Sequence, residues 1–85
     1  MNKGVESMEK YFDFIEEVKG IRGLKNLNVE YCSTYDSIYL NFTDKQFRSI
    51  DNEESKMFQD FSCLVDDYGF KMEFKYYGTI EVYEE

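Results

Sequence analysis

A repeated change in the spacing of the apolar residues restricts this fold more than any other feature of the chain. Over residues 5–19, apolar side chains recur at steps of three and four, which indicates an α-helix with one apolar side. Residues 27–32 and 37–43 then alternate between apolar and polar, which is typical of strands that bury one face. The first part of the chain therefore predicts a helix followed by two strands.

The same succession of spacings occurs a second time. A helical stripe runs through residues 57–68, and residues 70–77 and 79–83 alternate as strands. The apolar residues of the two stripes are Val5, Met8, Tyr11, Phe12, Ile15, Val18, Met57, Phe58, Phe61, Leu64, Val65 and Tyr68. Gly20 and Gly69 fit the left-handed position that commonly follows the last residue of a helix.

Between the two halves, residues 43–50 are predicted to be a linker with two apolar anchors, Phe47 and Ile50. Asp51 followed by Glu54 is a variant of the capping box, so we expect the second helix to begin there.

Loop lengths predict how the strands pair. A four-residue loop over residues 33–36 puts every apolar side chain of the first two strands on the same side. The pairs expected there are Tyr31 with Ile38, Val29 with Leu40 and Leu27 with Phe42. A three-residue loop over 77–79 would pair Tyr76 with Ile80 and Phe74 with Val82. One long strand kinked at Gly78 keeps the same alternation, so both alternatives stay open at this point.

The size and composition of the chain fit one small domain. Its 85 residues include eight Phe and eight Tyr, and large aromatic side chains build a core from few positions. We therefore expect a single α+β domain over residues 1–85, in the order α-β-β-α-β-β. Both helices would lie on one face of a four-stranded antiparallel sheet, in two layers.

The types of residue present limit the chemistry. The chain has no His, which removes the usual base of Ser and Cys triads and the commonest transition-metal ligand. Cys32 and Cys63 are too few for a disulfide framework, and no basic cluster lies near enough in sequence to activate either thiol. We therefore expect no enzymatic activity, no cofactor and no metal site. The sequence shows no signal peptide and no membrane span, so we expect a cytoplasmic protein.

Acidic residues dominate the first predicted helix. The formal net charge of the chain is −8, from 18 acidic and 10 basic residues, so direct binding to nucleic acid or to an anionic membrane is disfavoured. Like charges four residues apart destabilise a helix, so this acidic stripe is a candidate surface for a partner; the alternative is an ordinary solvated face that keeps a small protein soluble. The stripe consists of Glu6, Glu9, Asp13, Glu16 and Glu17.

Two further sets of residues are candidates for partner contact. Asp60, Asp66 and Asp67 lie on or beside the outward side of the second predicted helix, and the latter two are near its C-terminus, where carboxylates are unfavourable. Tyr39, Tyr77 and Tyr83 are expected on the outward face of the sheet, and tyrosine is enriched in interface hot spots.

In size, acidity and richness in Asp, Glu and Tyr, the chain resembles the small acidic proteins that phages encode against CRISPR nucleases, and immunity proteins that neutralise toxic nucleases. The resemblance implies a protein-binding inhibitor that occupies a basic, nucleic-acid-binding site on a partner such as a nuclease or its complex, by mimicking a phosphate backbone. No motif carries the resemblance, so it assigns no residue. The alternative is a structural module that forms a homodimer through the tyrosine-bearing sheet face or through an edge strand.

Overall fold

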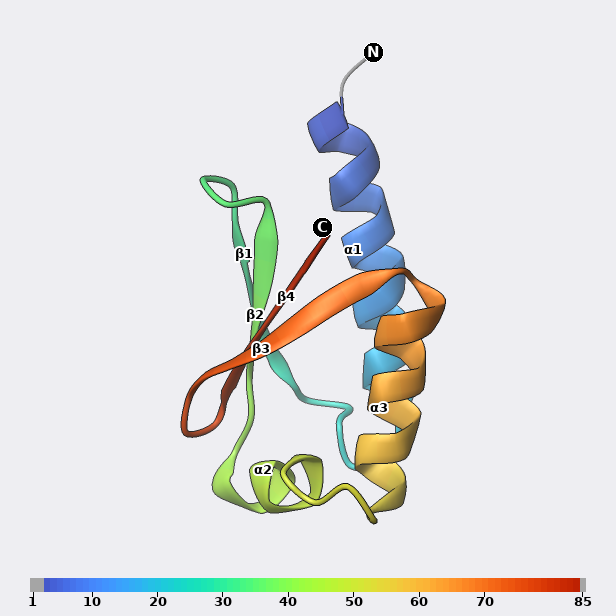
Figure 1. The fold of residues 1–85 in the computed structure, drawn as a ribbon, viewed down its shortest axis with the longest axis vertical. Coiled ribbons are helices and arrows are strands. Elements are labelled where there is room, and N and C mark those ends of the chain that lie inside the picture. Colours follow the sequence, from blue (N-terminus) through green and yellow to red (C-terminus); the bar gives the residue numbers. More distant parts are fainter. Residues whose placement is uncertain (1–2, 85) are drawn as a thin grey trace.

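The computed structural model describes the backbone of residues 3–84 and the side chains of residues 8–84. The fold is α+β, with three helices and a four-stranded antiparallel sheet (Figure 1). In chain order the elements are α1 (Lys3–Lys19), β1 (Asn28–Cys32), β2 (Ser37–Asn41), α2 (Asp44–Ile50), α3 (Lys56–Asp67), β3 (Phe70–Tyr76) and β4 (Thr79–Glu84). The predicted fold class is confirmed, but the predicted order lacked α2.

The strands lie in the order β1-β2-β4-β3, so β1 and β3 form the two edges of the sheet. Helices α1 and α3 lie side by side against one face, and α2 closes one end of the molecule (Figure 1). We call the opposite side of the sheet the outer face. No helix among residues 3–84 covers the outer face, which leaves its side chains open to a partner.

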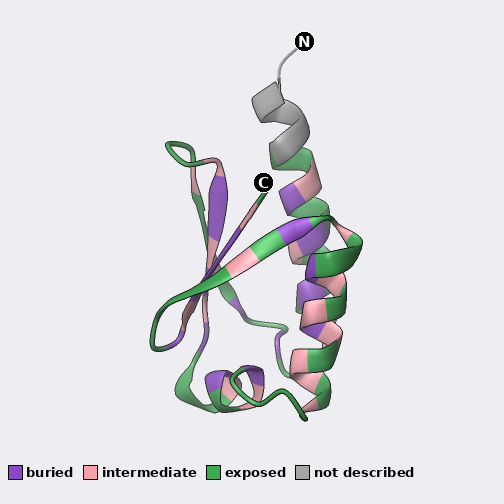
Figure 2. Ribbon diagram, viewed as in Figure 1, coloured by how far each residue is buried: buried purple, intermediate pink, exposed green. Residues whose placement is uncertain are grey.

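The core fills the space between the helices and the inner face of the sheet, where the buried sides of the elements meet (Figure 2). Aromatic rings make up much of it. The ring of Phe14 lies 6.3 Å from that of Phe61, 5.5 Å from that of Tyr68 and 5.2 Å from that of Phe70. The buried apolar residues are Tyr11, Phe14, Val18, Leu24, Leu27, Ile38, Leu40, Phe42, Phe47, Ile50, Phe61, Val65, Phe70, Ile80 and Val82.

The apolar side of α1 differs from the predicted stripe. Phe14, which the stripe omitted, is fully buried, whereas Phe12 is 53% exposed and Met8 is 36% exposed. Steps of three and four from Tyr11 lead through Phe14 to Val18, and this line faces the core, while Phe12 is rotated by about 100° from Tyr11. Val5 lies outside the residues whose side chains are described.

The residue after α1 also departs from expectation. Gly20 donates from its N–H to the carbonyl oxygens of Glu16 and Glu17, and the left-handed conformation occurs later, at Gly23 with φ 96°. After α3, by contrast, Gly69 does take the left-handed position, with φ 71°.

The predicted linker over residues 43–50 is wrong, because α2 occupies it. The Thr43 side chain accepts a hydrogen bond from the Gln46 N–H, and the Gln46 side chain accepts one from the Thr43 N–H. This reciprocal capping box starts the helix, and its signature, a Thr followed three residues later by Gln, stands in the sequence. Phe47 and Ile50 are buried, as expected of anchors.

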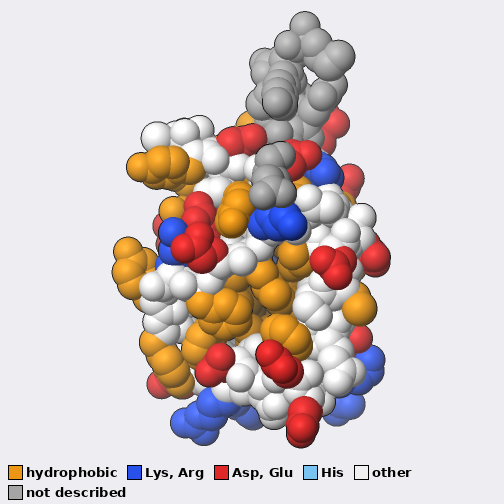
Figure 3. Space-filling model, in the orientation of Figure 1, with side chains coloured by type: hydrophobic (Ala, Val, Ile, Leu, Met, Phe, Trp, Pro, Cys, Tyr) orange, Lys and Arg blue, Asp and Glu red, His pale blue; other side chains and the backbone are white. Residues whose placement is uncertain are grey.

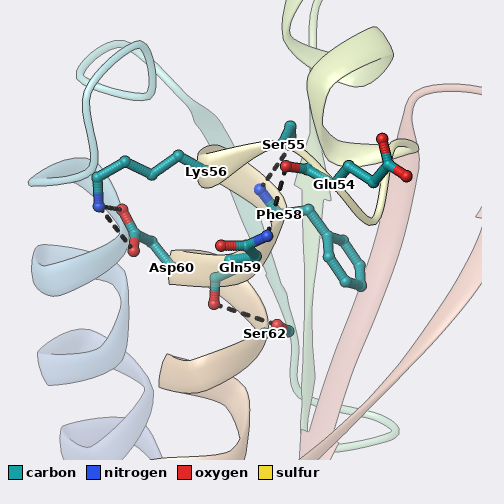
Figure 4. Close-up of polar contacts among 7 residues, drawn as sticks. All are labelled: Glu54, Ser55, Lys56, Phe58, Gln59, Asp60 and Ser62. Atoms are coloured by element: carbon teal, nitrogen blue, oxygen red, sulfur yellow. Dashed lines mark hydrogen bonds and ion pairs between the residues drawn. The ribbon is translucent and has the colours of Figure 1, made fainter.

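The start of the next helix is also shifted. Asp51 ends α2 rather than opening α3, so the capping box predicted from Asp51 and Glu54 is wrong. The N-cap of α3 is Ser55, whose hydroxyl accepts from the Phe58 N–H at 3.1 Å (Figure 4).

Strand pairing confirms one predicted hairpin and corrects the other. Tyr31 pairs with Ile38 and Val29 with Leu40, as predicted, and this ladder ends before Leu27 and Phe42. In the second hairpin Phe74 pairs with Ile80 and Tyr76 with Thr79, so the register differs from the predicted one. The loop is a turn at Tyr77-Gly78, Gly78 has φ 88°, and the alternative of one long kinked strand is wrong.

Between Phe74 and Tyr76, β3 holds one residue more than its partner strand, which makes a β-bulge. A bulge reverses the alternation of side chains beyond it. The strand therefore changes which of its last residues face outward.

Within residues 3–84 no helix combines the length and the apolar character needed to cross a membrane.

Candidate functional site

The structure offers three candidate surfaces, and the first is the exposed side of α1. Glu9, Asp13, Glu16 and Glu17 are all exposed. At about 100° per residue they lie within an arc of about 100° on the side away from the core. We call these four residues the acidic face. Glu6 belongs to the same predicted stripe but lies outside the residues whose side chains are described.

The acidic face keeps its charge. Among the described residues, no Lys or Arg forms an ion pair with any of its four carboxylates. Lys10, the basic residue nearest in sequence, pairs with Glu84 at 3.0 Å and lies 4.9 Å from the centre of the Phe70 ring. The acidic face is therefore a negative surface on one side of α1 that no ion pair of the described chain neutralises.

One carboxylate of the acidic face is held by a neighbouring helix. The Tyr68 hydroxyl donates to Glu17 Oε2, and this hydrogen bond is the largest cause that raises the pKa of Tyr68 to about 12. The contact joins the end of α3 to α1, because Tyr68 directly follows the last residue of α3. The position of the Glu17 carboxylate is therefore set by the packing of the two helices.

The aspartates of α3 divide into two kinds. Asp66 and Asp67 are exposed in a last turn that contains no basic residue. Asp60 is half-buried and pairs with Lys56 at 2.9 Å, one turn earlier (Figure 4). Of the three predicted aspartates, Asp60 is the one with an ion pair among the described residues.

The second surface is the outer face, and the structure separates the three tyrosines predicted there. Tyr39 and Tyr83 belong to it, each half-buried. Tyr77 does not: its ring centre lies 4.8 Å from that of Phe47, on α2. The bulge in β3 is the reason, because it turns Tyr76 outward where simple alternation placed Tyr77.

The outer face contains a groove with a volume of about 730 Å³. We call it the tyrosine groove, and it is lined by Glu30, Tyr35, Tyr39, Asn41, Lys75, Tyr76, Thr79 and Glu81. Sequence reasoning missed two of its rings. Tyr35, in the loop between β1 and β2, is 73% exposed, and Tyr76 is 75% exposed. The position of Tyr35 in a polar turn was a usable signal, whereas the outward position of Tyr76 depends on the bulge.

A buried carboxylate forms part of the groove floor. Glu81 is only 9% exposed, and its Oε2 accepts a hydrogen bond from Ser37 Oγ at 2.7 Å. That hydrogen bond is the largest cause that lowers the pKa of Glu81. Lys75 Nζ lies 3.4 Å from Glu81 Oε1 and 3.6 Å from Glu73 Oε1, and the hydrogen bond to Glu81 raises the pKa of Lys75. The floor is therefore polar, charged and held in place.

The third surface is a smaller cavity of about 250 Å³ beside the edge strand β3. Its lining includes Ile50, Phe58, Met72 and Phe74, together with the acidic residues Asp51 and Glu53. Apolar side chains gather on this side of the molecule, with acidic side chains below them (Figure 3).

The described residues contain no group of three His, Cys, Asp or Glu side chains placed to hold a metal ion. Of the two thiols, Cys63 is exposed and Cys32 is half-buried. The arrangement offers charged and aromatic surfaces for binding.

Comparison of the chain with protein-family models, with curated proteins and with solved structures finds no match.

Proposed function

We propose that this chain is a binding protein without enzymatic activity, and that its acidic face occupies a basic site on another protein. The observation that supports the proposal is that, among the described residues, no ion pair neutralises a carboxylate of that face. Four exposed carboxylates on one side of a helix create a potential that a basic surface relieves.

The spacing of the carboxylates favours a partner that binds nucleic acid. An α-helix rises about 1.5 Å per residue, so Glu9, Asp13 and Glu16 recur at about 4.5–6 Å along the axis. One strand of B-DNA carries a phosphate about every 3.4 Å of helix axis. The two densities of negative charge are of the same order, so a groove built for a phosphate backbone suits the acidic face.

An inhibitor of a nucleic-acid-binding nuclease is the most concrete form of this function, in line with the resemblance to anti-CRISPR and immunity proteins. By filling the phosphate-binding groove, the protein would exclude the nuclease substrate. In this proposal the protein is a cytoplasmic monomer and binds its partner inside the cell.

The test compares three baits in a nuclease-treated bacterial lysate. The first is the wild-type protein, and the second carries Glu9→Gln, Asp13→Asn and Glu16→Gln. The third carries Asp51→Asn, Glu53→Gln and Glu54→Gln, which removes the same charge from exposed positions outside the acidic face. Glu17 stays unchanged because it accepts a hydrogen bond from Tyr68.

The expected result is a basic, nucleic-acid-binding protein captured by the wild type and the third bait but not by the second. Its affinity should fall steeply between 0.1 and 1 M salt, as the Debye length shortens from about 10 to about 3 Å. Duplex DNA or RNA should compete with the bait. Equal capture by all three baits would remove the acidic face from this function.

A homodimer is the second candidate, and one observation favours it. The exposed rings of Tyr35 and Tyr76 stand on a sheet face that no helix covers within the described chain. Light scattering at micromolar concentration separates the two proposals, because a dimer that dissociates on Tyr76→Ser supports self-association and a monomer excludes it.

A further inference from the structure

Side chains on the outer face form rows that run across the strands, and one of these rows suggests a second binding site, on the side of the molecule away from the helices. Strand pairing aligns Glu30 with Tyr39, Tyr39 with Glu81, and Glu81 with Glu73. One row across all four strands therefore contains three carboxylates and one tyrosine ring. Lys75 lies between Glu73 and Glu81, and Lys71 pairs with Tyr83 in the neighbouring row of the same face.

Charge along the row is uneven. Lys75 contacts two of the carboxylates, and Ser37 donates a hydrogen bond to one of them, Glu81. Glu30, at the other end, is exposed and accepts a hydrogen bond from the neutral Asn41 amide at 3.0 Å. No Lys or Arg of the described chain pairs with it. Negative charge is therefore left over at the Glu30 end of the tyrosine groove.

Two backbone irregularities hold tyrosine rings at this groove. The bulge in β3 turns Tyr76 to the outer face. In the loop that carries Tyr35, Asp36 adopts a left-handed conformation, with φ 50°. The Asp36 carbonyl accepts from the Tyr11 hydroxyl at 2.6 Å, and its carboxylate accepts from the Tyr31 hydroxyl at 2.9 Å. These contacts anchor the loop, which lowers the entropy lost when a ligand binds.

We propose that the tyrosine groove binds an arginine side chain presented by an extended segment of a partner protein. A guanidinium group is planar, so it stacks on tyrosine rings while its fork of N–H donors reaches a carboxylate. Tyr35, Tyr39 and Tyr76 supply the rings, and Glu30 supplies the carboxylate. A volume of about 730 Å³ is large enough for the side chain together with flanking backbone.

The same residues disfavour a phosphate-bearing ligand. Tyrosine platforms on sheets stack the bases of single-stranded RNA, but such sites need a positive field along the backbone. Among the residues that line the groove, the carboxylates of Glu30 and Glu81 stand against the ammonium group of Lys75. The groove accordingly selects a cation.

The test is an NMR titration of the full chain at low salt with a defined probe, the peptide acetyl-Gly-Arg-Gly-Arg-Gly-amide. The matched probe replaces both arginines by citrulline, which keeps the shape and removes the charge. The expected result is a set of shifts at Tyr35, Tyr39, Tyr76 and Glu30 with the arginine peptide and none with the citrulline peptide.

Variants locate the site. Tyr76→Ala and Glu30→Gln should each weaken the binding of the arginine peptide by about two- to fivefold, as expected for an exposed cation–π or charged contact. Glu53→Gln, which makes the same charge change outside the groove, should leave the dissociation constant unchanged. Equal weakening by Glu53→Gln would reduce the effect to net charge and overturn the proposal.

The tyrosine groove and the acidic face lie on different sides of the molecule, so binding at one can be tested without the other. The variant Glu9→Gln, Asp13→Asn, Glu16→Gln should lose the basic partner and keep the shifts in the groove. Shifts restricted to α1, equal shifts with the citrulline peptide, or stronger groove shifts with a hexathymidine oligonucleotide or with a neutral sugar would each overturn the assignment of the groove to arginine.

Discussion

The hydroxyl of Tyr11 donates a hydrogen bond to the carbonyl oxygen of Asp36, 2.6 Å away, and accepts one from the Glu84 N–H at 3.0 Å. One buried phenol on α1 therefore joins the loop between β1 and β2 to the end of β4. The ring itself stacks on Phe70 at 4.9 Å. Tyr11 links the helix layer to one end of the sheet, where this loop and the end of β4 lie next to each other.

Replacing Tyr11 by Phe should lower the free energy of unfolding by about 1–3 kcal/mol, because two backbone groups lose their partner. Urea denaturation followed by circular dichroism measures the change. The matched control is Tyr31→Phe, which removes an exposed hydrogen bond to the Asp36 carboxylate. It should lower the free energy of unfolding by less than Tyr11→Phe does. Equal losses would mean that the phenol of Tyr11 has no special role.

Stability should fall at high pH. Burial is the largest cause that raises the pKa of Tyr11 to about 12 from an ordinary value of 10.0. Between these values the folded state keeps a proton that the unfolded chain releases, so the free energy of unfolding decreases as pH rises. Its contribution is fully present below pH 10 and is lost through about pH 12. Melting temperatures of the wild type and of Tyr11→Phe should therefore converge across this range, and parallel curves would contradict the assignment.

Phe14 and Phe12 should respond differently to truncation although they are two residues apart. Phe14→Ala empties a fully buried site among three aromatic rings and should cost about 3–5 kcal/mol. Phe12→Ala changes a side chain that is 53% exposed and should cost far less. Denaturant midpoints of the two variants measure the contrast. A larger loss for Phe12→Ala would show that α1 is rotated from its position here.

Gly78 and Gly69 both have positive φ, but only one is also crowded. A Cβ atom at Gly78 would lie 3.2 Å from the Phe42 carbonyl oxygen, whereas one at Gly69 would have no atom within 4 Å. Alanine at either position should cost about 1–2 kcal/mol for the left-handed backbone. Gly78→Ala should cost more than Gly69→Ala by thermal denaturation, and it should shift the NMR signals of the Tyr77-Gly78 turn. The reverse order would contradict the close approach of Gly78 to Phe42.

How far local pattern determines this protein is clearest in the first hairpin. Alternation placed Val29 and Leu40 opposite each other, and the structure pairs them. The charge of α1 could be located equally well, because helical spacing alone places Glu9, Asp13 and Glu16 on one side of a helix. The missed helix α2 had a local signal too, in the capping box of Thr43 and Gln46.

Tertiary structure decided the second hairpin, and with it the tyrosine groove. Pairing Phe74 with Ile80 or with Val82 leaves the same side chains facing the core, so alternation cannot distinguish registers that differ by an even number of residues. Contacts from distant parts of the chain do distinguish them. Phe42 donates its N–H to the Gly78 carbonyl at 2.7 Å, and the Phe47 ring packs against Phe74 and Tyr77.

The amino-acid sequence thus determined the fold class, the first hairpin and the acidic face, because each depends on periodicity within one element. Which tyrosines meet on the outer face depended on a bulge in β3, whose position follows from packing against α2 and the end of β2. Local periodicity cannot predict such contacts, because the residues that make them are separated by about thirty positions in the chain.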